Sequence, residues 1–300
     1  MNLRQKSQLP PVEADAYLIW PRAGNTGDFL IADACERFLL DRGIQVWRSD
    51  GSFEEAANAN DTQYLGAALS RFRGMLMFSG GGNIGIYPDN GIMRAAVLGQ
   101  AGPRHRCLVF SQSVLRPEQA LIDPRVTVWC RDRVSFAIMK QAGARVELVP
   151  DMALYMDEKI DKHPGGNKGT FFIKRTPRGD TETIQHNIDF DCPSEDLTFR
   201  NPLGRIVDTL KQYDTVISDR LHGALISLMM RKKTVLLPVG YHKNRAFYDT
   251  WLYSIAGATF VETQAELQPR MVALETPTCD FKALFCRSAD PALDRFLMGR

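Results

Sequence analysis

The stretch Thr215–Pro238 reads TVISDRLHGALISLMMRKKTVLLP, and it decides the fold. Two apolar runs in it, TVIS and TVLLP, have the length and the β-branched content of buried strands. The polar cluster SDRLHG (Ser218–Gly223) separates the first run from apolar residues that predict a helix over about 223–231. A strand, a helix and another strand in this order predict a parallel sheet. Ligands bind beyond the carboxyl ends of such strands, so this cluster is the first candidate site.

The composition excludes several classes of protein. The 300 residues carry 37 Lys and Arg against 35 Asp and Glu, and the charges alternate in sign, so we expect no nucleic-acid partner. The six cysteines lack CxxC spacing, which predicts free thiols in a reducing cytosol and no metal site. No signal-peptide core is visible, and no apolar run reaches the roughly 18 residues of a membrane span. We therefore expect a cytoplasmic protein, with any membrane contact peripheral and a homo-oligomer left open.

Short apolar runs alternate with helix-like segments along the whole chain, which predicts an α/β protein. The charged segment Met156–Gly169 interrupts the alternation and predicts a linker between two domains, 1–158 and 166–300. We expect two doubly wound, Rossmann-like domains facing each other across a cleft. The segment Phe281–Leu297 predicts a final helix that packs in the core or back on the first domain. The expected strands lie at AYLIWP (16–21), IQVWR (44–48), GMLMF (74–78), CLVFSQSV (107–114), VTVWC (126–130), VELV (146–149), TFFIKR (170–175), TVISDR (215–220), TVLLP (234–238) and ATFVE (258–262).

Two glycine-containing junctions in the first domain are candidate sites. GNTGD (24–28) is a tight turn that leads into a helix, where free N–H groups can meet a ligand near Asn25; the alternative is a simple N-cap by Asp28. FSGGGNIG (78–85) follows a strand with three consecutive glycines, which indicates close ligand approach or positive φ at Gly81, Gly82 and Asn83. The spacing fits neither GxGxxG nor a Walker loop, which disfavours a nucleotide.

The SDRLHG cluster favours an anionic ligand. The Arg220 guanidinium suits a carboxylate or a phosphate, and His222 can exchange a proton near neutral pH. The alternative is that Arg220 pairs with Asp219 or another acid while His222 caps the helix. Further cations follow strands of the same domain and can converge on one anion: Lys174, Arg175, Arg178 and Lys243. For Arg131 and Asp132 we expect a structural ion pair.

The ordered set of motifs resembles the polysaccharide pyruvyl transferases, the ketal pyruvyltransferases of exopolysaccharide biosynthesis. The pieces are GNTGD, SGGGNIG, CRDRVSF, VPDMAL, SDRLHG and GYHKN, spread from about Trp20 to Trp251. The resemblance implies a fold similar to the GT-B glycosyltransferases and an enzyme that moves pyruvate from phosphoenolpyruvate onto a sugar as a cyclic ketal. It implies no cofactor, a phosphoenolpyruvate site in the second domain and a sugar acceptor, lipid-linked oligosaccharide included, at the inner face of the cytoplasmic membrane.

The resemblance also implies roles for single residues. Arg220 and His222 match the positions of the anion-binding arginine and the catalytic acid, and Leu221 and Ser218 complete that motif. The second arginine is Arg175 or Arg178, since the register of RGDTE (178–182) is shifted by about three residues from the strand end. Asp28 is the expected base. Two alternatives stay open: a sugar-nucleotide glycosyltransferase of the same fold and a non-catalytic binding homologue.

Overall fold

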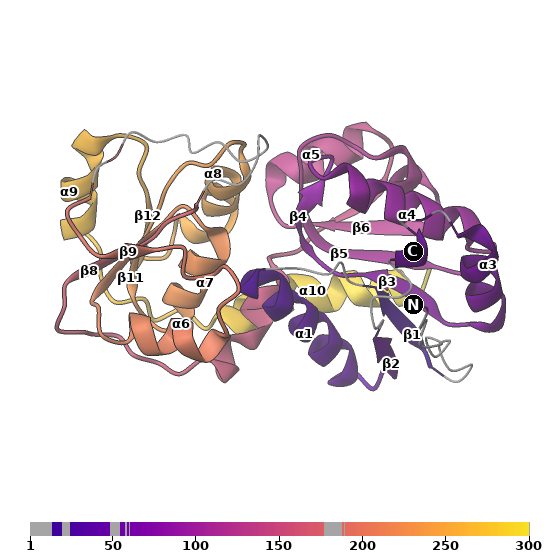
Figure 1. The fold of residues 1–300 in the computed structure, drawn as a ribbon, viewed down its shortest axis with the longest axis horizontal. Coiled ribbons are helices and arrows are strands. Elements are labelled where there is room, and N and C mark those ends of the chain that lie inside the picture. The colour runs from indigo at the N-terminus through magenta and orange to yellow at the C-terminus, as the bar shows by residue number, and fades with distance from the viewer. Residues whose placement is uncertain are drawn as a thin grey trace, which may run out of the picture.

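The computed structural model shows an α/β protein built on two parallel sheets, which confirms the predicted fold class (Figure 1). We call the first sheet with helices α1 to α5 the first half, and the second sheet with helices α6 to α9 the second half. The structure describes residues 14–19, 25–48, 55–57, 59, 61–176, 188 and 190–299.

The first sheet has seven strands, six of them in the order β2-β1-β3-β5-β6-β7, with β4 paired to β5. The centre of this sheet is fully buried, because Met77 lies between Leu18 and Leu108 of the neighbouring strands and none of the three side chains is exposed. Strands buried on both faces read as continuous apolar runs, which is the pattern of these segments. The strands are β1 (Ala16–Ile19), β2 (Val46–Arg48), β3 (Met75–Phe78), β4 (Gly81–Ile84), β5 (Cys107–Val114), β6 (Val126–Cys130) and β7 (Arg145–Leu148). The helices are α1 (Thr26–Leu40), α3 (Thr62–Arg71), α4 (Pro88–Gln100) and α5 (Arg133–Gln141), with short turns η1 (Gln119–Ile122) and η2 (Met152–Lys159).

The second sheet has five strands in the order β12-β11-β10-β8-β9. The opening stretch forms its centre, because Ile217 lies between Phe172 and Val235. The helix that follows is buried at every position except His222, as its mostly apolar sequence requires. The strands are β8 (Thr170–Ile173), β9 (Ser194–Glu195), β10 (Thr215–Ser218), β11 (Lys233–Leu236) and β12 (Ala258–Phe260). The helices are α6 (Leu203–Leu210), α7 (Leu221–Met229), α8 (Lys243–Phe247), the π-helical η3 (Tyr248–Leu252) and α9 (Gln264–Val272).

The last helix, α10 (Phe281–Leu297), returns to the first half (Figure 1). Its Phe285 ring lies 5.4 Å from the Phe38 ring of α1 and 5.7 Å from the Tyr155 ring of η2. Arg295 forms an ion pair of 2.6 Å with Glu147 of β7. The end of the chain therefore completes the core under the first sheet.

Two element predictions need correction. The glycine-rich segment expected as a loop contains a short strand, β4, which pairs with β5 and places Asn83 in the sheet edge. The expected linker begins later, because η2 continues to Lys159 and buries Tyr155 and Asp157. Within the described ranges, no helix is long and apolar enough to cross a membrane.

Candidate active site

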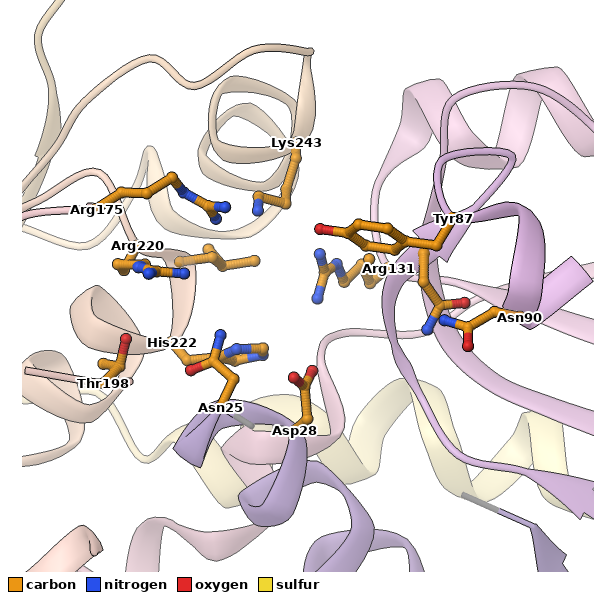
Figure 2. A pocket seen from close by; sticks show the side chains of 13 residues that line it. Asn25, Asp28, Tyr87, Asn90, Arg131, Arg175, Thr198, Arg220, His222 and Lys243 are labelled. Atoms are coloured by element: carbon orange, nitrogen blue, oxygen red, sulfur yellow. The ribbon is translucent and has the colours of Figure 1, made fainter. Parts of the chain in front are cut away.

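A cavity of about 170 Å³ lies between the carboxyl ends of the strands of both sheets (Figure 2). Its wall is strongly polar and includes four basic side chains, one histidine and one carboxylate. The lining residues are Asn25, Asp28, Gly82, Asn83, Tyr87, Asn90, Arg131, Arg175, Thr198, Arg220, Leu221, His222 and Lys243. Of the residues predicted from sequence, nine line this cavity: Asn25, Asp28, Gly82, Asn83, Arg175, Arg220, Leu221, His222 and Lys243.

The second half supplies most of the positive charge. Arg175 follows β8, Arg220 follows β10, and Lys243 begins α8 after β11. The amide of Asn244 donates to the carbonyls of Asp219 and Leu237, both at 2.9 Å, and so fixes the segment that carries Lys243 to the turn that carries Arg220. The GYHKN and SDRLHG motifs thus form one unit around the cavity.

Ser218 shapes this turn and does not line the cavity. Its hydroxyl accepts from the Arg220 N–H at 3.0 Å and lies 2.8 Å from the Arg220 carbonyl. Gly223 packs against the same hydroxyl, since a Cβ there would lie 2.8 Å from it. Ser218 therefore holds the backbone of Arg220, and its predicted contact with substrate stays a prediction.

Arg220 is paired with an acid, as the structural alternative anticipated, and it still faces the cavity. Its Nη2 lies 2.6 Å from Oδ2 of Asp196 and its Nε donates to Oδ1 at 3.1 Å. Both side chains are buried. Because Asp196 engages the Nε edge of the guanidinium, its other edge is left toward the cavity. Helix α7 begins directly after Arg220, and the Arg220 side chain makes no hydrogen bond that caps this helix. The alternative in which His222 caps α7 is not seen among the described contacts.

The first half brings the amino end of α1 against His222. Asn25 is the N-cap residue of α1, and Asp28 lies in its first turn. Gly27 permits the contact, because a Cβ at this position would lie 2.0 Å from Nδ1 of His222. The Thr26 N–H also donates to the Thr198 carbonyl of the second half at 2.9 Å. The GNTGD motif therefore serves as a docking point for the histidine of the other half.

The two glycines of β4, Gly81 and Gly82, lie near the cavity, and Gly82 allows close packing at its edge. A Cβ on Gly82 would lie 2.5 Å from a guanidinium nitrogen of Arg131 and 2.9 Å from the Tyr241 hydroxyl. That hydroxyl donates to the Gly82 carbonyl at 3.2 Å across the two halves. Gly81 has φ +144°, a backbone conformation that favours glycine, and it does not line the cavity.

Arg131, Asp151 and His222 form a chain of charged groups at the cavity floor. Arg131 Nη1 lies 2.6 Å from Oδ2 of Asp151, with the two side chains 1% and 0% exposed. The same carboxylate oxygen lies 3.4 Å from Nε2 of His222. Burial alone would raise the pKa of Asp151, but His222 and Arg131 outweigh burial and hold that pKa far below its ordinary value.

Asp28 is the one carboxylate among the residues that line the cavity. Burial raises the pKa of Asp28 above its ordinary value, although the nearby His222, Lys243 and Arg131 act in the opposite direction. A carboxyl group whose pKa is moved toward neutrality suits proton transfer.

Sequence reasoning missed several residues of the cavity. Arg131 forms the expected ion pair, with Asp151 rather than with Asp132, and also lines the cavity. Tyr87, Asn90 and Thr198 were not singled out. The available signal was position: Arg131 and Asp151 both follow strands of the first sheet, where the ends of parallel strands meet. Arg178 lies outside the described residues.

Comparison with known proteins decides the family. Residues 25–241 match the family model described as polysaccharide pyruvyl transferase. The chain belongs to the polysaccharide pyruvyl transferase family. The match includes every residue that lines the cavity except Lys243, which lies two residues beyond its end. The family indicates a pyruvyltransferase enzyme with a role in polysaccharide biosynthesis.

This pyruvyl transferase is similar to one curated protein and to one solved structure. A protein of Bacillus subtilis strain 168, named "Putative pyruvyl transferase EpsO", is 22% identical over 317 residues, which cover 87% of this chain and 94% of that protein. A crystal structure of a functionally uncharacterized protein from Klebsiella pneumoniae subsp. pneumoniae NTUH-K2044 matches with a TM-score of 0.61 and 20% identity, covering 82% of this chain and 93% of the other. The second likeness shows the fold alone.

Within the described part of the chain, no three His, Cys, Asp or Glu side chains gather as metal ligands do. That the enzyme needs neither metal nor cofactor stays a prediction.

Proposed function

We propose that this pyruvyl transferase moves pyruvate from phosphoenolpyruvate onto a sugar of a polysaccharide or lipid-linked oligosaccharide, where it forms a cyclic ketal. The observation that carries the proposal is the convergence of Arg175, Arg220 and Lys243 with His222 in one cavity. Phosphoenolpyruvate carries a carboxylate and a phosphate on adjacent atoms, so it needs several cations and one proton donor in a small space.

The second half would hold the donor. Arg175 and Arg220 offer guanidinium groups to its carboxylate and phosphate, and Lys243 adds a point charge. The amino end of α7, with the backbone of Leu221, adds partial positive charge on the same side of the cavity. As phosphate leaves, these groups stabilise the growing negative charge on its oxygens.

His222 would start the reaction as general acid. It gives a proton to the methylene carbon of the enol phosphate, which leaves an oxocarbenium-like centre. One sugar hydroxyl attacks this carbon, the bond to phosphate breaks, and a second hydroxyl of the same sugar closes the ring. One phosphoenolpyruvate and two hydroxyls thus give one ketal and inorganic phosphate, with one hydroxyl proton ending on phosphate and the other replacing the proton of His222.

The first half would hold the acceptor. Its cavity wall carries neutral hydrogen-bonding groups, Asn25, Asn83 and Asn90, and the 38% exposed ring of Tyr87, which suits a sugar ring. Two buried oxygens of the cavity wall, Oδ1 of Asn25 and Oγ1 of Thr198, have no hydrogen-bond partner among the described residues and can serve acceptor hydroxyls. Asp28, beside them, would take the proton of the attacking hydroxyl.

A donor site in one half and an acceptor site in the other suit a two-domain enzyme. We place the acceptor in a Rossmann-like domain over residues 1–158 and the donor in a second over 166–300, facing each other as in GT-B glycosyltransferases. A lipid-linked acceptor would place the enzyme at the inner face of the cytoplasmic membrane. Contacts of α10 with the first sheet support a return of the chain end to the first domain.

Calorimetric titration with phosphoenolpyruvate tests the donor site. We expect binding by the wild type and a loss of about 10- to 100-fold in affinity for Arg220→Ala, the range for a hydrogen bond to a charged group. Arg205→Ala is the matched control, because Arg205 is an exposed arginine of the same half, paired with Glu195. Equal affinity of wild type and Arg220→Ala would contradict the assignment, and binding of a nucleotide diphosphate in place of phosphoenolpyruvate would favour a glycosyltransferase.

A further inference from the structure

We propose that Asp151 of the first half is the positioning residue that orients His222 of the second half and places a negative charge beside its imidazole, so that the acid of the reaction is assembled from both halves. The catalytic meaning rests on the function proposed above, whereas the pairing itself stands on geometry. Asp151 belongs to none of the predicted site residues, and it reaches the cavity through His222 and Arg131.

The first observation is the complete burial of the carboxylate. Asp151 is 0% exposed, and its Oδ1 accepts from the Ala153 N–H at 2.9 Å at the start of η2. Its Oδ2 is shared by Arg131 and His222. A buried carboxylate of this kind must stay charged and cannot rotate away, so it presents a fixed negative charge to the imidazole.

The second observation is the length of the contact. The distance of 3.4 Å between His222 Nε2 and Asp151 Oδ2 exceeds the roughly 2.8 Å of a tight charge-assisted hydrogen bond. The carboxylate therefore favours the imidazolium electrostatically without holding its proton in a short bond.

The third observation is the origin of the two partners. Asp151 and Arg131 follow β7 and β6 of the first sheet, whereas His222 begins α7 of the second. Gly27 lets the imidazole pack on the first half, so the histidine meets its carboxylate only when the halves are docked. The other charged groups that face this region are Asp28 from α1, Arg220 before α7 and Lys243 from α8.

The test measures how fast diethyl pyrocarbonate carbethoxylates His222 at a series of pH values. The reagent attacks only the neutral imidazole, and mass spectrometry reports the extent of modification. The plateau rate at high pH reports accessibility, and the midpoint of the pH profile reports how strongly the ring holds its proton. For Asp151→Asn we expect the plateau rate to stay unchanged and the midpoint of the pH profile to move to lower pH. A move of about one pH unit would make modification of His222 about tenfold faster than in the wild type at pH values below the midpoint. His163, far from this pair, is the internal reference, and Asp151→Glu should restore the wild-type profile.

Arg131→Gln is the second variant, in case Asp151→Asn does not fold. Removing the guanidinium leaves the full carboxylate charge to His222, so the midpoint should move to higher pH, the opposite direction. A changed plateau with an unmoved midpoint, in whichever variant folds, would show a merely structural role and overturn the proposal. So would equal changes at His222 and His163.

Protection by phosphoenolpyruvate separates this proposal from the proposed function. A shifted midpoint together with slower modification in the presence of phosphoenolpyruvate supports both. A shifted midpoint without protection supports the pairing and counts against the donor site.

Discussion

At the scale of the residue, burial of Asp28 opposes the ionisation of its carboxyl group. Its raised pKa means that the folded protein holds a proton on this carboxyl more tightly than the unfolded chain does. Stability is therefore lost as the pH rises through the folded-state pKa. Functional sites commonly carry such locally unfavourable groups.

We predict that Asp28→Asn is more stable than the wild type at pH 7, because the amide removes the buried charge. The gap in stability should narrow at a lower pH, below the raised folded-state pKa, where the wild-type carboxyl holds its proton. Thermal unfolding at both pH values measures this. If Asp28 is the base, phosphate release with an acceptor sugar falls about 100-fold or more while phosphoenolpyruvate binding is retained. A lower melting temperature at pH 7 would show that the ionised carboxylate is stabilising.

Single residues were predictable where the motif itself carries charge. Arg220, His222 and Lys243 follow strands of one sheet, and the rule on strand ends brought them together. Asp196 and Thr198 lie in an irregular segment after β9 with no periodic pattern, so their approach to the cavity depends on tertiary folding. Arg131 was expected to be structural because an acid, Asp132, follows it directly in sequence.

At the scale of the element, α1 and α7 meet through the missing side chain of Gly27. We predict that Gly27→Ala displaces His222, because the new methyl would lie 2.0 Å from its ring nitrogen. Overpacking of this kind costs about 1–3 kcal/mol. Urea unfolding measures the loss, and phosphate release should fall with it.

The matched control is Gly204→Ala in α6, where a Cβ meets no atom within 4 Å. This change should be neutral or stabilise by about 0.5–1 kcal/mol, since alanine favours a helix. If Gly27→Ala unfolds like Gly204→Ala, the close contact between α1 and His222 is absent in solution.

Most elements followed from apolar periodicity, and the errors have physical causes. The segment after Phe78 contains too many glycines to read as a strand, yet its pairing with β5 makes β4 one. The segment Met156–Lys159 reads as a charged linker, yet Asp157 is buried because Lys162, Arg231 and the Phe281 N–H all bind its side chain. Neither pairing is visible without the distant partner.

At the scale of the whole molecule, α10 covers the first sheet from the far end of the sequence. We predict that Phe285→Ala destabilises the protein by about 3–5 kcal/mol, the cost of a large cavity in a core. The phenylalanine is fully buried between α1 and η2. Leu297→Ala, at a partly exposed position of the same helix, should change the free energy of unfolding by less than about 1 kcal/mol. Similar urea midpoints for the two variants would mean that α10 is dispensable to the first half.

The two parallel sheets followed from the alternation of strands and helices, whereas the order of the strands within each sheet comes from the structure. The return of α10 was one of several alternatives, because an amphipathic helix does not show in its own sequence which surface it covers. The domain limits 1–158 and 166–300 stay a prediction.

The return of α10 also sets the order in which this protein can mature on the ribosome. The strands of the first sheet are synthesised early, but the helix that seals Phe38 and Trp129 is synthesised only after the whole second sheet. Nascent chains usually fold from the amino end, so the first sheet forms while its aromatic face is still uncovered. During translation the first half is therefore a natural client for a chaperone that binds apolar surface, until the segment from Phe281 onward leaves the exit tunnel.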